Sequence, residues 1–226
     1  MSLILNIDTA TEMAHVSIAK DGAVLKAYHN DLQKDHASFL QPAIQRLAGE
    51  TGLALTDVDA IAVTGGPGSY TGLRVGLASA KGLCYALNKP LIMLSTLEVL
   101  TASAFLSDQS SDKPALFCPM IDARRMEVFT AIYDDQLTTQ LSPQPMILDE
   151  TSFSESLKKS TVVFFGNGSD KWKTLCTHPN ALFKSVLILP EAMAQLSNIF
   201  LERNQFADIA YSEPMYLKDF QTLATR

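Results

Sequence analysis

The segment from residue 65 to residue 76 has the glycines and hydroxyl side chains that an anion-binding turn needs. Its sequence is G-G-P-G-S-Y-T-G-L-R-V-G, and it lies between an apolar run and a helical pattern. Exposed backbone N–H groups at the start of a helix can bind phosphate. A P-loop is excluded, because no lysine follows a glycine at the required spacing. The dinucleotide-binding pattern also fails, since its third glycine, Gly72, comes one residue late.

A structural role explains most of the same residues. Ser69 or Thr71 can cap the helix that follows. The segment does not match a serine-hydrolase elbow either, because Pro67 and Thr71 stand two residues before and after Ser69, where that motif has glycines. A tight turn at the start of a helix therefore fits this segment as well as an anion site does.

Two aspartates end apolar runs at corresponding places in the two halves of the chain. Asp8 begins a polar turn that could hold phosphate, whereas Asp122 begins a turn with Arg124 and Arg125 and no glycine. Two bulky arginines take up room that a loop around a nucleotide needs, so we interpret any cleft here as degenerate. The arginines contact an anion or an acidic partner, or are simply solvated. The candidate cleft residues are Asp8, Thr9, Thr11, Asp122, Gly166 and Gly168.

The helix predicted over 71–87 carries an unusual number of small side chains. They form two rows at a spacing of four, which are Gly72, Gly76, Ala80 and Cys84, and Ala78, Gly82 and Ala86. Each interior glycine costs about 1 kcal/mol relative to alanine. Small rows let a second element approach closely, so this helix is expected to be covered on two sides. The neighbour is either the helix expected at 36–48 of the same chain or a second subunit, and the sequence leaves both open.

Metal and cofactor chemistry have little support in the sequence. The four histidines form no H-x-H, H-x-x-x-H or H-E-x-x-H pair. The three cysteines, Cys84, Cys118 and Cys176, form no C-x-x-C pair, and we interpret them as free thiols in a reducing compartment. We therefore expect no metal and no cofactor.

The composition favours a folded protein that does not grip nucleic acid unaided. The chain has 226 residues, of which 47% are hydrophobic and 19% charged, with a net charge of −6. Unaided binding to nucleic acid usually needs a basic surface, because phosphate contacts supply much of the affinity. No apolar run approaches the ~20 residues that span a bilayer, and the first residues do not resemble a signal peptide. We expect a cytoplasmic protein without membrane contact.

The pattern of elements predicts an α/β fold built twice. The turn Asp21-Gly22 joins two predicted strands, as in a β-hairpin. The first half is expected to have strands near 3–8, 15–19, 23–28, 60–63 and 91–94, and helices near 36–48, 71–87 and 96–106. The second is expected to have strands near 115–122, 126–133, 136–146 and 161–165, and helices near 153–159 and 190–203. Two βββαβα units are the plan of the actin-like (ASKHA, ribonuclease-H-like) ATPases. We divide the chain into lobes 1–106 and 107–226, with the last helix able to pack back on the first lobe.

Several motifs together resemble one known family, that of TsaB (YeaZ), within the wider TsaD or glycoprotease-like group. They are I-D-T-A-T (7–11), G-P-G-S-Y-T-G-L-R-V-G (66–76), A-K-G-L (80–83), S-T-L-E (95–98), D-A-R-R-M-E-V-F (122–129) and E-P-M-Y-L-K (213–218). The resemblance implies a two-lobed actin-like fold and a role in forming threonylcarbamoyladenosine beside the tRNA anticodon. It implies a TsaD-like catalytic partner, a TsaE-like ATPase, a homodimer when alone, and contact with tRNA only through the complex.

One departure bears on the role. Thr96 and Leu100 stand where TsaD-like proteins have the two histidines of a metal motif, and neither side chain can replace an imidazole. The resemblance therefore implies a non-catalytic scaffold. A nucleotide-binding ATPase or a glycoprotease-type metallopeptidase is the alternative.

The partner surface is expected on the helix pair of the first lobe. Its candidate residues are Phe39, Leu40, Ala43, Gly72, Leu73, Gly76 and Ala80. A bulky residue at Gly76 or Ala80 is expected to abolish pairing while the monomer stays folded.

Overall fold

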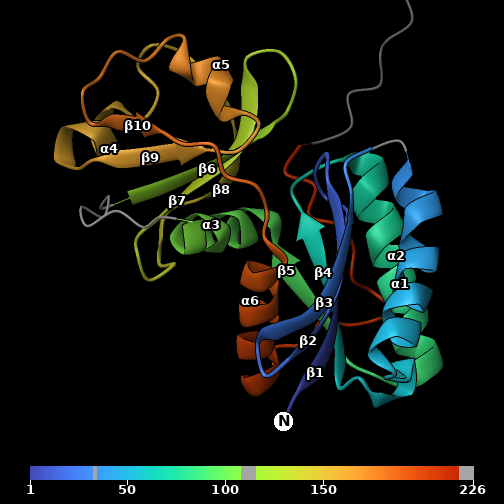
Figure 1. Cartoon of the computed structure of the whole chain (residues 1–226). Helices are drawn as coiled ribbons and strands as arrows, with labels where there is room; N and C mark the ends of the chain where they lie inside the picture. Colours follow the sequence, from blue (N-terminus) through green and yellow to red (C-terminus); the bar gives the residue numbers. More distant parts are fainter. Residues whose placement is uncertain (33–34, 108–115, 219–226) are drawn as a thin grey trace, which may run out of the picture.

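The computed structural model describes residues 1–32, 35–107 and 116–218, which form two lobes (Figure 1). The strands of the first sheet are β1 (Leu3–Asp8), β2 (Ala14–Lys20), β3 (Ala23–Asn30), β4 (Ala60–Gly66) and β5 (Leu91–Ser95). Those of the second are β6 (Leu116–Asp122), β7 (Glu127–Tyr133), β8 (Thr139–Ile147), β9 (Val162–Phe165) and β10 (Ala181–Phe183). The orders are β3-β2-β1-β4-β5 and β10-β9-β6-β7-β8. Taken from β8 to β10, the second sheet has the third, second, first, fourth and fifth strands of its lobe in that order, which is also the order of the first sheet. The predicted duplication is therefore confirmed.

Helices cover both faces of the first sheet. They are α1 (His36–Thr51), α2 (Tyr70–Leu87), α3 (Thr96–Ser107) and α6 (Pro190–Glu202). The first two lie on one face and α6 lies on the other, beside α3 (Figure 1). Among the described residues, the second sheet is accompanied by the short helices α4 (Ser154–Lys159) and α5 (Ser169–Lys173). A 3-10 helix of the first lobe, η2, spans Leu55–Asp57. No helix of the described residues has the length and apolar character to cross a membrane.

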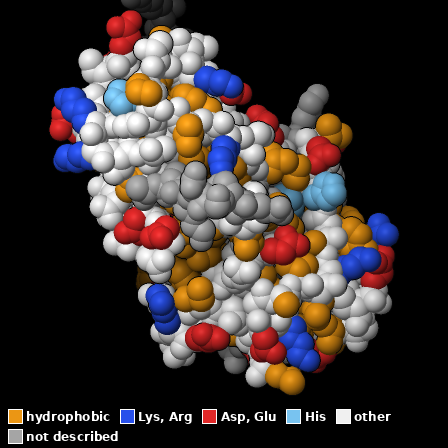
Figure 2. Space-filling model, turned by 60° about the vertical axis from the view of Figure 1, so that its left-hand side comes forward, with side chains coloured by type: hydrophobic (Ala, Val, Ile, Leu, Met, Phe, Trp, Pro, Cys, Tyr) orange, Lys and Arg blue, Asp and Glu red, His pale blue; other side chains and the backbone are white. Residues whose placement is uncertain are grey.

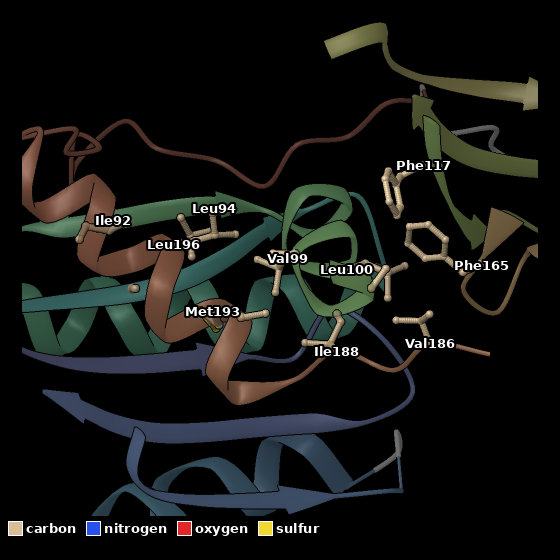
Figure 3. Packing of buried hydrophobic residues seen from close by; sticks show 14 of the residues in the cluster. Ile92, Leu94, Val99, Leu100, Phe117, Phe165, Val186, Ile188, Met193 and Leu196 are labelled. Carbon is tan, nitrogen blue, oxygen red and sulfur yellow. The ribbon is translucent and has the colours of Figure 1, made fainter. Parts of the chain in front are cut away.

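Side chains alternate along β1 and so serve two different cores. Leu5 and Ile7 face α1 and α2, whereas Ile4 belongs to the cluster on the opposite face. That second cluster continues into the other lobe through α3. Figure 3 shows Leu100 directed toward Phe117 and Phe165, which lie on β6 and β9. The two lobes therefore share one hydrophobic core around α3.

The last helix, α6, packs on the first lobe. It contacts β1, β2, β3 and β5 as well as α3. Met193 and Leu196 lie in the same cluster as Ile92 and Leu94 (Figure 3). The boundary between 106 and 107 stays a prediction, and Ala115, the expected start of a strand, lies outside the described residues.

Most element predictions differ from the structure by one or two residues. Pro42 is the seventh residue of α1 rather than part of the first turn. Helix α5 and strand β10 were not predicted, because five and three residues are too short to show a period.

Candidate functional site

The carboxylate of Asp8 holds the turn that follows β1. Asp8 is fully buried, and its Oδ1 accepts hydrogen bonds from Thr64 Oγ1 at 2.6 Å and from the Ala10 N–H at 3.0 Å. Its second oxygen, Oδ2, has no hydrogen-bond partner among the described residues. One side of this carboxylate is therefore used to fix the backbone, and the other is left without a partner.

At three positions near the start of α2 there is little room for a side chain larger than that of glycine, because the β1–β2 turn lies against them. A Cβ on Gly72 would lie 2.0 Å from the backbone oxygen of Thr9, and one on Gly76 would lie 2.3 Å from Thr9 Oγ1. A Cβ on Gly68 would lie 2.3 Å from the backbone oxygen of Ala10. Contacts this short do not occur, so backbone oxygens exclude a Cβ at Gly68 and Gly72, and a Cβ at Gly76 would force the Thr9 hydroxyl to move.

Hydrogen bonds join the same turn to the helix start. The Ser69 N–H donates to the Ala10 oxygen at 2.7 Å, and Thr9 Oγ1 donates to the Gly72 oxygen at 2.7 Å. Ser69 Oγ caps the helix by accepting from the Gly72 N–H at 3.3 Å. The helix start that could have bound an anion is thus packed against the chain's own turn, and Ser69 is the cap that the sequence suggested.

The corresponding residues of the second lobe lie nearer the surface. Asp122 is 40% exposed and forms an ion pair with Lys171. Its N–H donates to Asn167 Oδ1 at 2.9 Å. Gly166 has a φ of +91°, and a Cβ there would lie 2.4 Å from the Met120 oxygen. Gly166 therefore lies close against the backbone of β6, and the negative charge of Asp122 is balanced by the positive charge of Lys171.

The predicted cleft residues only partly come together. A cavity of about 210 Å³ lies between the lobes, and Thr11 and Gly166 both line it. Asp8, Thr9, Asp122 and Gly168 do not line it. The two lobes meet at its edge, where Asn167 Nδ2 donates to Glu12 Oε1 at 3.5 Å.

One histidine of this cavity has an unusual environment. His15 lies on β2 beside Asp8 of β1, is 7% exposed, and neither ring nitrogen has a hydrogen-bond partner among the described residues. Burial lowers the pKa of His15, an effect that the Asp8 carboxylate partly offsets. Asn6, two residues before Asp8, is also buried with both amide atoms unpartnered. The sequence analysis missed His15 and Asn6, although strand alternation places them on the face of Asp8.

Six of the seven predicted partner residues are buried within the chain itself. They are Leu40, Ala43, Gly72, Leu73, Gly76 and Ala80, while Phe39 is half-buried. Their burial against the chain's own elements accounts for their size and polarity. Whether the helix pair also contacts a partner stays a prediction.

The second row of small residues on α2 faces outward. Ala78, Gly82 and Ala86 are exposed, and a Cβ on Gly82 would have no described atom within 4 Å. Tyr85 beside them is 84% exposed.

The C-terminal segment 206–218 covers a further side of α2. Lys81 Nζ donates to the backbone oxygens of Ala210 and Ser212 at 3.2 and 3.0 Å. Arg74 Nε donates to Tyr216 OH at 2.9 Å. Helix α2 is therefore covered by β4, by α1 and by this segment, so the prediction that a second side besides the sheet side is covered is confirmed. The segment lacks a hydrophobic period, so only its E-P-M-Y-L-K motif drew attention to it.

The buried thiols are not poised for chemistry. Burial raises the pKa of Cys84 and of Cys118 to about 12, so both stay protonated at neutral pH.

Burial also raises the pKa of Glu98. No cluster of three or more His, Cys, Asp or Glu side chains that could hold a metal occurs within residues 1–32, 35–107 and 116–218.

Comparison with known proteins gives consistent results. The family model of TsaD, tRNA N6-adenosine threonylcarbamoyltransferase, matches residues 29–219. The tRNA threonylcarbamoyladenosine biosynthesis protein TsaB of Escherichia coli (strain K12) is 31% identical over 227 residues, covering 96% of this chain and 94% of that protein.

Solved structures agree with the fold. A Pseudomonas aeruginosa protein with similarity to the peptidase YEAZ has a TM-score of 0.83 at 28% identity, over 96% of this chain and 100% of that one. An inorganic polyphosphate/ATP-glucomannokinase from Arthrobacter sp. strain KM has a TM-score of 0.51 at 10% identity, over 90% and 100% of the two chains, and shows the shared fold alone. The predicted α/β fold of two actin-like lobes is confirmed.

Proposed function

The chain belongs to the TsaB family, and from this premise we propose that it serves tRNA threonylcarbamoyladenosine biosynthesis as a non-catalytic subunit. In this proposal it dimerises with a TsaD-like transferase, which carries out the chemistry. A TsaE-like ATPase joins the pair, and the chain forms a homodimer when alone. The work would take place in the cytoplasm, where tRNA is modified.

The outer row of α2 is the observation that carries the proposal. Gly72 and Gly76 are explained by the contact with Thr9, but Gly82 has open space around it. An exposed glycine inside a helix costs about 1 kcal/mol relative to alanine, and nothing within the described chain requires it. With Ala78 and Ala86 it forms a smooth strip onto which a helix of another chain can pack closely, and the exposed Tyr85 is a residue type enriched in interfaces.

The proposal that the chain is non-catalytic rests on two places where chemistry could occur. They are the position of the metal motif of TsaD-like proteins and the start of α2. Thr96 and Leu100 are buried on α3 and provide no imidazole. The start of α2 is packed against Thr9 and Ala10, and the Ser69 N–H donates to the Ala10 oxygen. Both features support a subunit that positions a partner.

The charge distribution supports contact with tRNA through the complex. The net charge is −6. On the face drawn in Figure 2, lysine and arginine side chains are scattered among acidic ones over both lobes. Self-sufficient RNA binding would favour a clustered basic surface, so a partner is the better candidate for holding the tRNA backbone.

The first experiment is size-exclusion chromatography with light scattering on this protein, alone and mixed with the TsaD-like protein of the same organism. We expect a 1:1 complex that displaces a homodimer. Gly82→Leu is expected to abolish both assemblies while the circular dichroism spectrum and the melting temperature stay near those of the wild type. Lys159→Leu on α4 adds the same side chain to an exposed helix of the second lobe and is the matched control. Pairing that survives Gly82→Leu would contradict the proposed surface.

Gly76 is unsuitable as a probe of pairing. Its Cβ would lie 2.3 Å from Thr9 Oγ1, so a bulky residue there disturbs the monomer. The expectation that such a variant stays folded is thus corrected, and lost pairing in it would not separate interface from fold.

A titration with ATP, with and without Mg²⁺ or Zn²⁺, tests the non-catalytic assignment. We expect no turnover by the isolated protein. Tight binding with hydrolysis of ATP, or metal-dependent peptide cleavage, would contradict the proposal in favour of the enzymatic alternative.

A further inference from the structure

The interlobe cavity has the chemistry of a site for a small organic cation. We propose that it binds the primary ammonium group of a short aliphatic amine, with His15 as the inner acceptor and Glu12 and Asp31 as the carboxylates at the rim. This inference goes beyond the scaffold role and does not depend on it.

Among the described residues of its wall, the charged groups of the cavity are all acidic. These residues are Thr11, Glu12, Met13, His15, Asp31, Leu100, Ile121, Gly166, Asn167, Val186, Leu187 and Ile188, which include two carboxylates and no lysine or arginine. Glu12 and Asp31 are exposed, so they can meet a ligand as it enters. Two carboxylates without a basic residue repel a phosphate and attract an ammonium group.

His15 supplies an unused acceptor inside the cavity. His15 is 7% exposed as a residue, and neither ring nitrogen is hydrogen-bonded within the described chain. Such a group costs free energy unless a ligand or solvent pairs with it. Burial lowers the pKa of His15, so the ring is neutral at pH 7 and one nitrogen carries a free lone pair. An ammonium group has three N–H donors and no acceptor, and so matches this nitrogen and the carboxylates.

The rest of the wall suits an alkyl chain. Leu100, Ile121, Val186 and Ile188 are buried apolar side chains that line the cavity. Figure 3 shows Leu100, Val186 and Ile188 gathered below Phe117 and Phe165. The cavity of about 210 Å³ is smaller than the roughly 300–1,000 Å³ of sites for drug-sized ligands. A chain of four or five carbons with a terminal ammonium is the class that this shape and charge admit.

The test follows the ring signals of the histidines by NMR in the full-length protein, with His15 assigned from their loss in His15→Val. The ligands are 1,4-diaminobutane and Nα-acetyl-lysine methylamide, at an ionic strength of about 20 mM so that screening is weak. Butan-1-ol and butanoate match the alkyl chain without the ammonium group. We expect saturable shifts of the His15 signals with an amine and none with the other two compounds.

The two amines distinguish the sources of the group. Saturation by the diamine supports a free polyamine, and saturation by the lysine derivative alone supports a lysine side chain of a partner. Absence of saturation with both amines, equal shifts with butan-1-ol, or displacement of the amine by ATP would overturn the proposal.

Rim variants keep the test decisive if His15→Val folds poorly. Glu12→Gln and Asp31→Asn each remove one charge from an exposed position, and each is expected to weaken amine binding about fourfold. Asp135→Asn removes a charge from an exposed turn of the second lobe that does not line the cavity, and should leave the affinity unchanged. Affinity that is the same in all three variants would also overturn the proposal. None of these results depends on pairing with a TsaD-like protein.

Discussion

The two lobes have the same strand order but differ in what surrounds the end of their first strand. In the first lobe Asp8 is buried, and the turn after it is clamped against a glycine-bearing helix of 18 residues. In the second lobe Asp122 is half-exposed and paired with Lys171, and the helix beside it, α5, has five residues. The repeated topology thus fixes where an acidic residue stands and leaves its environment free to diverge.

The residue opposite each aspartate shows the same divergence. Asp8 pairs across the sheet with His15, and Asp122 pairs with Val128. A valine needs no hydrogen-bond partner in a buried site, whereas an imidazole does. At this position the first lobe therefore carries a polar side chain without a partner among the described residues, and the second lobe carries an apolar one.

The clamped turn should give the largest difference between the lobes. Gly72→Ala drives a Cβ into the backbone oxygen of Thr9, which cannot move aside, and should lower the free energy of unfolding by about 3 kcal/mol. In the second lobe, the Cβ of Gly168→Ala would lie 2.8 Å from a methyl group of Val128 and 3.1 Å from the nearest backbone atoms, which is less close than at Gly72, and should cost about 1 kcal/mol. Urea denaturation of both variants measures the difference. Equal losses would mean that the two turns are packed alike.

Replacing each aspartate by alanine should show a second difference between the lobes, in the free energy of unfolding that is lost. Asp8→Ala leaves the Thr64 hydroxyl and the Ala10 N–H buried without an acceptor, and is expected to cost about 2 kcal/mol. Asp122→Ala breaks an exposed ion pair with Lys171 and should cost about 0.5 kcal/mol. The same denaturation measurement applies. A larger loss for Asp122→Ala would reverse the proposed division between a buried and a surface aspartate.

A change of pH should affect the first lobe through His15. Burial lowers the pKa of His15 below its ordinary value of 6.5, against smaller opposing effects of Asp8, Asp31 and Glu191, while His29 adds to the lowering. Near pH 6.5, His15 therefore binds a proton more readily in the unfolded chain than in the folded protein. The free energy of unfolding falls as the pH drops below that value. The fall should approach about 1.4 kcal/mol per pH unit.

His15→Val gives the first lobe the residue type of the second and should remove this contribution. Denaturation at pH 7 and pH 5.5 would show a smaller loss in the variant than in the wild type. Identical losses would show that His15 is protonated in the folded protein.

The smallest effect is expected where the C-terminal segment joins the lobes. Lys218 forms an ion pair with Glu127 of β7 and is 39% exposed. Lys218→Ala should cost about 0.5 kcal/mol, and less in high salt, since exposed ion pairs are screened. Hydrogen exchange at the Met215 N–H, which donates to the Gly65 oxygen at 2.7 Å, should become faster. Unchanged exchange would mean that the backbone bond alone holds the segment.

Hydrophobic periods made the elements and the duplication predictable, because burial on one face imposes a spacing that the sequence retains. The glycines of α2 showed that some atom approaches closely, but a glycine does not specify which atom. For Gly72 and Gly76 the neighbour is Thr9, near in space and 63 and 67 positions away in sequence. Residues of the buried row of α2 were predicted to contact a partner, and in the structure the row with Gly82 is the exposed one.

The cavity could be predicted only in part. Thr11 and Gly166 were chosen because they follow strands, and strand ends in a repeated fold meet between the lobes. His15 was overlooked because a single histidine in an alternating strand usually has a satisfied partner. Whether a ring nitrogen of His15 finds a hydrogen-bond partner depends on how α6 and the segment before it pack. Residues distant in the sequence determine that packing.

The packing of α6 on the first sheet has a consequence for synthesis on the ribosome. Residues 190–202 complete a face of the sheet whose own strands end at residue 95. Translation at about 5–20 residues per second leaves that apolar face uncovered for about 5–20 s after its last strand emerges. The nascent first lobe therefore keeps part of this apolar face exposed, and the face is completed only when nearly the whole chain has been made.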